Sequence, residues 1–161
     1  MVVGNRRAGY APNVTHIGSG AQLRRVARGL LVVVSILNGI AGVVCGLLFL
    51  AGPDGHLMGA GALLPVVQQL PLADLFFQGF IWIGVAMLLV LGAPNSVAAV
   101  MLLRNSENQY LATLIAGVLL VLWCGFELIF MFNALAVSYF VVGLVSIMSS
   151  IVLLKPARVS A

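Results

Sequence analysis

The sequence predicts an all-α integral membrane protein, a bundle of four transmembrane helices joined by one long loop and two short turns. Of the 161 residues, 62% are apolar and only 7% are charged, whereas a soluble domain carries about 25% charged residues. Four apolar runs are each long enough to cross a bilayer, which takes about 20 residues at 1.5 Å per residue. Basic residues flank these runs, as topology signals do.

The four expected spans cover residues 29–51, 79–103, 110–132 and 135–154. The first is expected to be retained as an anchor, because its charged lead-in and its apolar core are both longer than those of a signal peptide. Residues 23–155 then form one membrane domain. Residues 1–22 are expected to be a disordered cytoplasmic tail and residues 156–161 a short cytoplasmic one.

All eight Lys and Arg residues fall on one side of the predicted bundle. They are Arg6, Arg7, Arg24, Arg25, Arg28, Arg104, Lys155 and Arg158. The positive-inside rule assigns this side, and with it both termini, to the cytoplasm. The cluster of Arg24, Arg25 and Arg28 also suits anionic lipid headgroups, although its role in topology already accounts for it. No base-reading motif accompanies the net charge of +4, so nucleic acid is not an expected partner.

Residues 52–78 form the long outer loop. Pro53-Asp54-Gly55 predicts a turn, with proline presetting φ and glycine permitting a positive φ. Residues 57–75 are too apolar for a free aqueous loop and too short to span, so we expect an interfacial or partly re-entrant segment over the outer mouth. Asp54 and His56 are two potential metal ligands, fewer than a zinc site needs, so a polar turn is expected and no metal.

Small residues mark helix contacts in lipid, where apolar side chains have little reason to seek each other. Gly39, Gly42 and Gly46 share one stripe of the first span with Asn38, and "GVVCG" is a GxxxG motif. Each other span carries a similar stripe, so a self-packed bundle is expected.

Pro94 is expected to kink the second span. Asn95 or Ser96 can then serve the carbonyls that the proline leaves without a donor. Asn38 lies at a similar depth, so a hydrogen bond from Asn38 to Asn95 or Ser96 is also expected.

Glu127 is the only charged residue inside a predicted span and lies near the outer end of the third. No basic residue in any span balances it, which favours its neutral form. Its expected partners by depth are Gln78, the Trp82 indole and the loop residues Gln68 and Gln69. Three interpretations stay open: a protonated structural hydrogen-bonder, a contact with a partner subunit's polar or basic group, and a proton- or cation-binding site in transport.

Cys45 and Cys124 lie inside apolar segments, and the sequence contains no CxxC pair. Neither a disulfide framework nor a thiol–disulfide relay is therefore indicated. Buried cysteines of this kind usually behave as small apolar residues.

The stretch "GPDGHLMG", the aspartate of "LADLFFQG", a glycine-bearing second span and a Trp-bearing third span occur together. This combination resembles a group of small bacterial four-span membrane proteins, without an assigned activity, that carry a P-D-G-x-L-x-G loop after the first helix. The resemblance covers roughly residues 29–154. It implies location in the bacterial cell membrane and no mechanism.

The sequence contains no nucleophile–base pair, phosphate-binding loop or metal cluster, so no cofactor is expected. The expected function is that of a non-enzymatic accessory or scaffold subunit that binds other membrane components. The alternative is a proton-coupled small-solute transporter or channel, working as a homo-oligomer through Glu127 with Gln78 and Asn38. An enzyme acting on a lipid or quinone at the outer mouth, through His56 and Asp54, is a more distant third.

Overall fold

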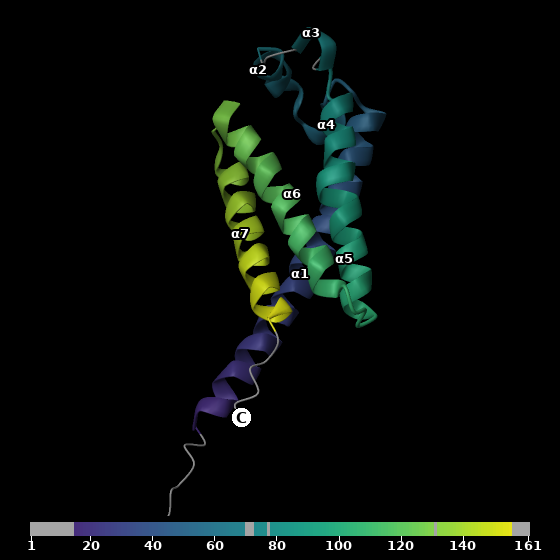
Figure 1. Cartoon of the computed structure of the whole chain (residues 1–161). Helices are drawn as coiled ribbons and strands as arrows, with labels where there is room; N and C mark the ends of the chain where they lie inside the picture. Colours follow the sequence, from purple (N-terminus) through teal and green to yellow (C-terminus); the bar gives the residue numbers. More distant parts are fainter. Residues whose placement is uncertain (1–14, 70–72, 77, 131, 156–161) are drawn as a thin grey trace, which may run out of the picture.

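The computed structural model describes residues 15–69, 73–76, 78–130 and 132–155 (Figure 1). Every regular element within these ranges is helical. Four helices are long and apolar enough to cross a membrane, and they cover Gly20–Ala51, Ile81–Leu103, Gln109–Ile129 and Ala134–Leu154. The prediction of an all-α, multi-pass membrane fold with four spans is thus confirmed.

The second span is divided into three pieces, whereas the first, third and fourth are single helices. The single helices are α1 (Thr15–Ala51), α6 (Gln109–Phe130) and α7 (Ala134–Leu154). The divided span comprises α4 (Ile81–Ala86), the π-helical segment η3 (Met87–Gly92) and α5 (Ala93–Leu103). The long loop carries η1 (His56–Met58), η2 (Gly61–Leu63), α2 (Leu64–Val67) and α3 (Ala73–Phe76).

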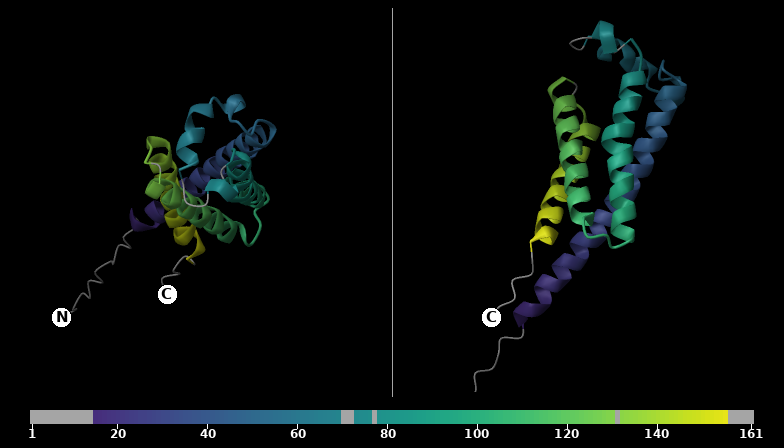
Figure 2. Two further views of the ribbon diagram at one scale, coloured as in Figure 1. Left: turned by 90° about the horizontal axis from the view of Figure 1, so that it is seen from above. Right: turned by 45° about the vertical axis from the view of Figure 1, so that its right-hand side comes forward.

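The four spans form two hairpins that meet at one end and separate at the other (Figures 1 and 2). One hairpin pairs α1 with α4, η3 and α5, and the other pairs α6 with α7. We call the end where α1 begins and α7 ends the basic end, and the end under α2 and α3 the loop end. At the basic end α1 packs against α7 and α5 against α6, whereas α4 and α6 diverge toward the loop end.

Two arginines of α1 close the basic end. The guanidinium of Arg24 donates to the carbonyls of Val152, Leu153 and Lys155 at the end of α7, at 3.3, 3.0 and 3.1 Å. Arg28 donates to Leu102 O at 3.1 Å and to Asn105 Oδ1. The last carbonyls of a helix have no intrahelical partner and carry partial negative charge, so these arginines cap the C-termini of α7 and α5.

The start of α1 corrects the expected N-terminal tail. The prediction placed a disordered tail over residues 1–22, but α1 begins at Thr15. The physical reason is that a formed helix extends by one hydrogen bond per residue, and no proline interrupts residues 15–28. Residues 1–14 and the predicted tail over 156–161 lie outside the described residues.

The glycine stripe of α1 faces the second span of the same chain. A Cβ added at Gly42 would lie 2.3 Å from the backbone nitrogen of Gly92, which no backbone tolerates. At Gly46 an added Cβ would lie 2.9 Å from Gly84 O, and at Gly39 it would lie 2.9 Å from the Ser96 hydroxyl. The two backbones therefore touch along this stripe, as small residues allow in lipid.

Pro94 follows directly after the π-helical segment, where the amide of Ala93 donates to Leu88 O, five residues back. Asn95 Nδ2 donates to Leu91 O at 2.9 Å. This is a neighbour of Val90 O, the carbonyl that residue 94 would serve in an α-helix, so the predicted service of the carbonyls freed by Pro94 stays a prediction. The expected hydrogen bond of Asn38 is wrong: Asn38 Nδ2 is buried and has no partner among the described residues. Asn95 instead directs its amide nitrogen to Leu91 O of its own helix.

The long loop folds back onto the loop end of the bundle (Figure 1). Gly55 has a φ of +79°, which confirms the predicted turn. The amide of Phe80 donates to Pro53 O at 2.8 Å and closes the base of the loop. Val67 of α2 is buried in one cluster with Phe49 and Phe80, so the loop covers the end of the first hairpin.

Candidate functional site

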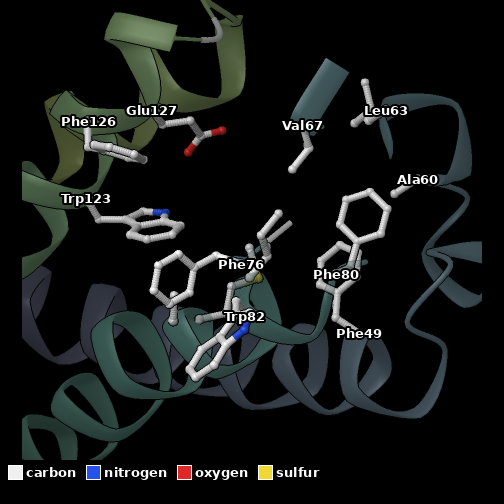
Figure 3. Close-up of a pocket in the computed structure, with 13 residues that line it drawn as sticks. Phe49, Ala60, Leu63, Val67, Phe76, Phe80, Trp82, Trp123, Phe126 and Glu127 are labelled. Atoms are coloured by element: carbon white, nitrogen blue, oxygen red, sulfur yellow. The ribbon is translucent and has the colours of Figure 1, made fainter. Parts of the chain in front are cut away.

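The divergence of the two hairpins leaves a cavity at the loop end (Figure 3). Its volume is about 360 Å³, within the range of about 300–1,000 Å³ for small-molecule sites. Its walls come from α1, α4 and η3 on one side, α6 on the other, and the long loop above. The lining residues are Phe49, Ala60, Leu63, Val67, Phe76, Phe80, Trp82, Ile83, Ala86, Met87, Trp123, Phe126 and Glu127.

Aromatic rings dominate the wall of this cavity, and they occur in three pairs. Phe49 and Phe80 stack with ring centroids 5.0 Å apart, in the first hairpin. Phe76 meets the edge of Trp82 at 5.4 Å, and Trp123 lies 6.2 Å from Phe126 on α6. Such pairs are stabilised by ring electrostatics beyond their buried area, so they present a firm apolar wall.

Glu127 is the only ionisable side chain among the lining residues. It points from α6 into the cavity (Figure 3). Its Oε1 accepts a hydrogen bond from Asn133 Nδ2 at 3.1 Å. Asn133 is itself fixed, because its Oδ1 caps α7 by accepting from the amide of Ala136 at 2.7 Å. The carboxyl is thus held in place from one side while the other side faces the cavity.

A second cavity of about 230 Å³ adjoins the first. Phe49, Met87, Trp123 and Glu127 line both. The rest of its wall comes mainly from α1, η3, α6 and α7, and it includes Cys45, Leu120 and Tyr139. Glu127 therefore stands where two spaces between the hairpins meet.

The sequence-based partners of Glu127 are distributed differently in the structure. Trp82 lines the same cavity as Glu127, as its predicted depth requires. Gln78 is exposed and donates to the Asp74 carbonyl at 3.3 Å. Gln68 and Gln69 are exposed on the loop. Asn133, which the sequence analysis did not name, holds the carboxyl instead.

Asn133 could have been found from its sequence position. Asn directly before an apolar run is a helix N-cap signal, and such a cap at the start of the fourth span faces the end of the third. Asn38 belongs to another part of the bundle: it is buried next to Gly39, which packs on Ser96 of α5.

Asp54 and His56 form a pair in the loop, away from the cavity lining. His56 Nδ1 lies 2.5 Å from Asp54 Oδ1, and both side chains are well exposed. The side-chain hydrogen bond from His56 holds the pKa of the Asp54 carboxyl below its ordinary value. In the ranges that the structure describes, no group of three or more His, Cys, Asp or Glu residues could hold a metal ion. Cys45 and Cys124 are both free thiols.

Comparison with models of protein families, with curated proteins and with solved structures gives no match for this chain. The resemblance of its loop motif to small bacterial four-span proteins therefore stays a prediction.

Proposed function

We propose that the protein is a non-enzymatic binding protein of the cell membrane that receives a small, largely apolar membrane component between its two hairpins. The observation that carries this proposal is the cavity of about 360 Å³, whose lining combines six aromatic rings with one carboxyl group. Apolar and aromatic walls with a few convergent polar groups are typical of small-molecule sites.

The shape of the cavity favours a small molecule over a helix of a partner subunit. Its walls come from three sides: the first hairpin, α6 and the long loop. The glycine stripe of α1 packs within this chain, so it does not offer a contact to a partner subunit. Binding of a partner protein or a second copy remains a prediction for the lipid-facing surfaces.

The proposed orientation has both termini in the cytoplasm and the cavity in the outer half of the bilayer. The five described basic residues support it, because all lie at the basic end: Arg24, Arg25, Arg28, Arg104 and Lys155. The long loop is then an interfacial segment at the outer surface. We place the protein in a bacterial cell membrane on the resemblance of its loop motif.

Intrinsic fluorescence tests the proposal, because the chain has two tryptophans and both line the cavity. In a Trp82→Phe protein in micelles of an uncharged detergent, ω-bromoundecanol should quench Trp123 saturably, since bromine quenches on contact. Ala86→Phe, which places a ring in the cavity, should abolish the saturable component of the Trp123 quenching. Ala93→Phe places the same ring on an exposed position of α5 and should leave it intact. Quenching without saturation, or equal quenching in both variants, would overturn the proposal.

A proton-coupled transporter remains the second candidate. The observation that favours it is the position of Glu127, which lines both cavities, together with that of η3, whose Met87 also lines both. Single-turn π segments are frequent at functional sites. Under this function, Glu127→Gln in proteoliposomes should abolish proton-coupled solute uptake while leaving the protein folded. Flux that persists unchanged in this variant would exclude it.

A further inference from the structure

The position of Glu127 sets a requirement for whatever fills the cavity. The described Lys and Arg side chains lie at the opposite end of the bundle, where Arg24 and Arg28 cap helices. One polar side chain, Asn133, donates to the carboxyl, and no other hydrogen bond to it occurs among the described residues. A carboxyl that faces an apolar space needs a donor or a positive charge beside it. The ligand can supply both.

The aromatic rings that line the same cavity as Glu127 also favour a positively charged ligand. The indole of Trp123 and the ring of Phe126 lie on α6 within one turn of Glu127, and Phe76 and Trp82 face them from the other side (Figure 3). The face of an aromatic ring carries negative electrostatic potential and attracts cations, and ammonium groups are bound in this way by clusters of rings. An ammonium head supplies the positive charge that would stabilise the ionised form of the Glu127 carboxyl, whereas an anionic head would be disfavoured by the ring faces and by that form.

We propose that the cavity binds an amphiphile with an ammonium head, which lies against Glu127 and the indole of Trp123, while its apolar chain fills the space toward Phe49, Phe80 and Val67. This proposal rests on the proposed binding function and names its ligand class. The same chemistry has two sources in a membrane: the ammonium headgroup of a phospholipid, and a lipophilic amine dissolved in the bilayer. Both kinds of molecule carry a positive charge on an apolar chain that can enter the cavity from the bilayer.

A series of head groups on one chain tests the proposal in the Trp82→Phe protein, with Trp123 as reporter. The probes are ω-bromoundecyltrimethylammonium, ω-bromoundecanol and ω-bromoundecanoate. The expected order of affinity is ammonium, then alcohol, then carboxylate, with about tenfold between the first two, as for a partly desolvated cation beside a carboxylate and ring faces. This order needs no substitution at Glu127, so it is measurable even if a variant there fails to fold.

Two variants assign the effect to the carboxyl. Glu127→Gln keeps the shape and the acceptor for Asn133 and should lower the affinity for the ammonium probe about tenfold while leaving the alcohol unchanged. Glu107→Gln removes a matched, exposed carboxylate at the basic end and should change neither. Equal affinity for all three heads, or an ammonium affinity that Glu127→Gln leaves unchanged, would overturn this inference and leave the binding function standing. Absence of saturable quenching by any probe would overturn both.

Lipids with brominated chains distinguish the two sources. If brominated phosphatidylethanolamine quenches Trp123 saturably and competes with the ammonium probe, the headgroup of a lipid is the ligand. If neither brominated phosphatidylethanolamine nor brominated phosphatidylglycerol competes, while the ammonium probe still binds, the ligand is a free lipophilic amine. If phosphatidylglycerol competes as well as phosphatidylethanolamine, the ammonium head is not recognised, and the inference is overturned.

Discussion

At the scale of single residues, the two buried asparagines Asn38 and Asn95 differ in their hydrogen bonding. Asn95 uses its Nδ2 to satisfy Leu91 O beside the π-helical segment. Asn38 is as deeply buried, yet its Nδ2 has no partner among the described residues. A buried donor without an acceptor costs about 1–3 kcal/mol, so the two side chains should have opposite effects on stability.

Replacing each asparagine by leucine, which has nearly the same shape, tests this difference. Asn38→Leu removes an unpaired donor and should raise the free energy of unfolding by about 1 kcal/mol. Asn95→Leu removes the side-chain donor to the buried carbonyl of Leu91 and should lower the free energy of unfolding by about 1 kcal/mol or more. Thermal unfolding in a mild detergent measures both. Equal destabilisation by the two variants would mean that a water or other group satisfies Asn38.

At the scale of elements, the crossing of α1 and η3 depends on the absence of side chains. Gly42 and Gly92 face each other so closely that an added Cβ on Gly42 would lie 2.3 Å from a backbone nitrogen. Backbone atoms at a helix crossing cannot move aside as a flexible side chain can. The crossing holds α1 against the second span, and these two spans form one wall of the cavity.

Gly42→Ala and Gly125→Ala form a matched pair that tests this crossing. Both substitutions replace a glycine inside a transmembrane helix and gain about the same helix propensity, ~1 kcal/mol. At Gly125 the nearest atom to an added Cβ is Phe140 Cε2 at 3.8 Å, an ordinary contact. Gly42→Ala should therefore lower the thermal midpoint clearly, while Gly125→Ala should leave it equal or raise it. An unchanged midpoint for Gly42→Ala would contradict the close crossing.

The elements themselves were predictable from the sequence, because a span is defined by composition and length. Three of the four spans agree with the prediction within a few residues, and the first agrees at its end, Ala51, but begins at Gly20 rather than Gly29. The divergence of the hairpins was not predictable. It depends on how bulky residues such as Phe49 and Trp123 pack between the helices. In lipid, apolar residues cover both the packed and the exposed faces of a helix, so their spacing in the sequence does not show which helix faces touch and which separate. The contact of Glu127 with Asn133 was not predicted either, because it depends on how the end of α6 lies against the start of α7.

At the scale of the whole molecule, the basic end is tied together and the loop end is open. Arg24 bonds α1 to α7, and Arg28 bonds α1 to α5 and the turn after it. Thr113 and Ser150 share a buried hydrogen bond of 2.8 Å between α6 and α7 near the same end. Arg24 therefore joins the two hairpins, and Arg28 holds together the two spans of the first hairpin.

Charge-neutral variants separate the capping role of these arginines from their role in membrane topology. Arg24→Gln and Arg28→Gln should each lower the free energy of unfolding by about 1.5–3 kcal/mol, the range for hydrogen bonds from charged groups. Arg25→Gln removes the same charge from an exposed side chain between them and should change stability little. All three should change the topology bias equally. Thermal unfolding, with a reporter fused to the C-terminus for topology, measures both. Equal loss of stability in all three would contradict the capping role.

The tied basic end predicts that ligand binding moves only the loop end. Spin labels at Leu50 of α1 and Ile129 of α6, both exposed, report on the open end, and labels at Leu103 and Leu154 report on the tied end. Replacing Cys45 and Cys124 with alanine first removes the two free thiols. Without ligand, the distance distribution between Leu50 and Ile129 should be broad, because no described side chain fills the space between the hairpins there.

Binding of the ammonium probe should narrow this distribution, since a ligand in contact with both walls removes their freedom to separate. The pair at Leu103 and Leu154 should give one narrow distribution with and without the probe, because the arginine caps hold α1, α5 and α7 together. If the distance distributions of both label pairs were equally broad, or shifted equally on binding, the basic end would not be the fixed end of the bundle. A loop end that is narrow before ligand is added would mean that the cavity is preformed and that binding needs no closure.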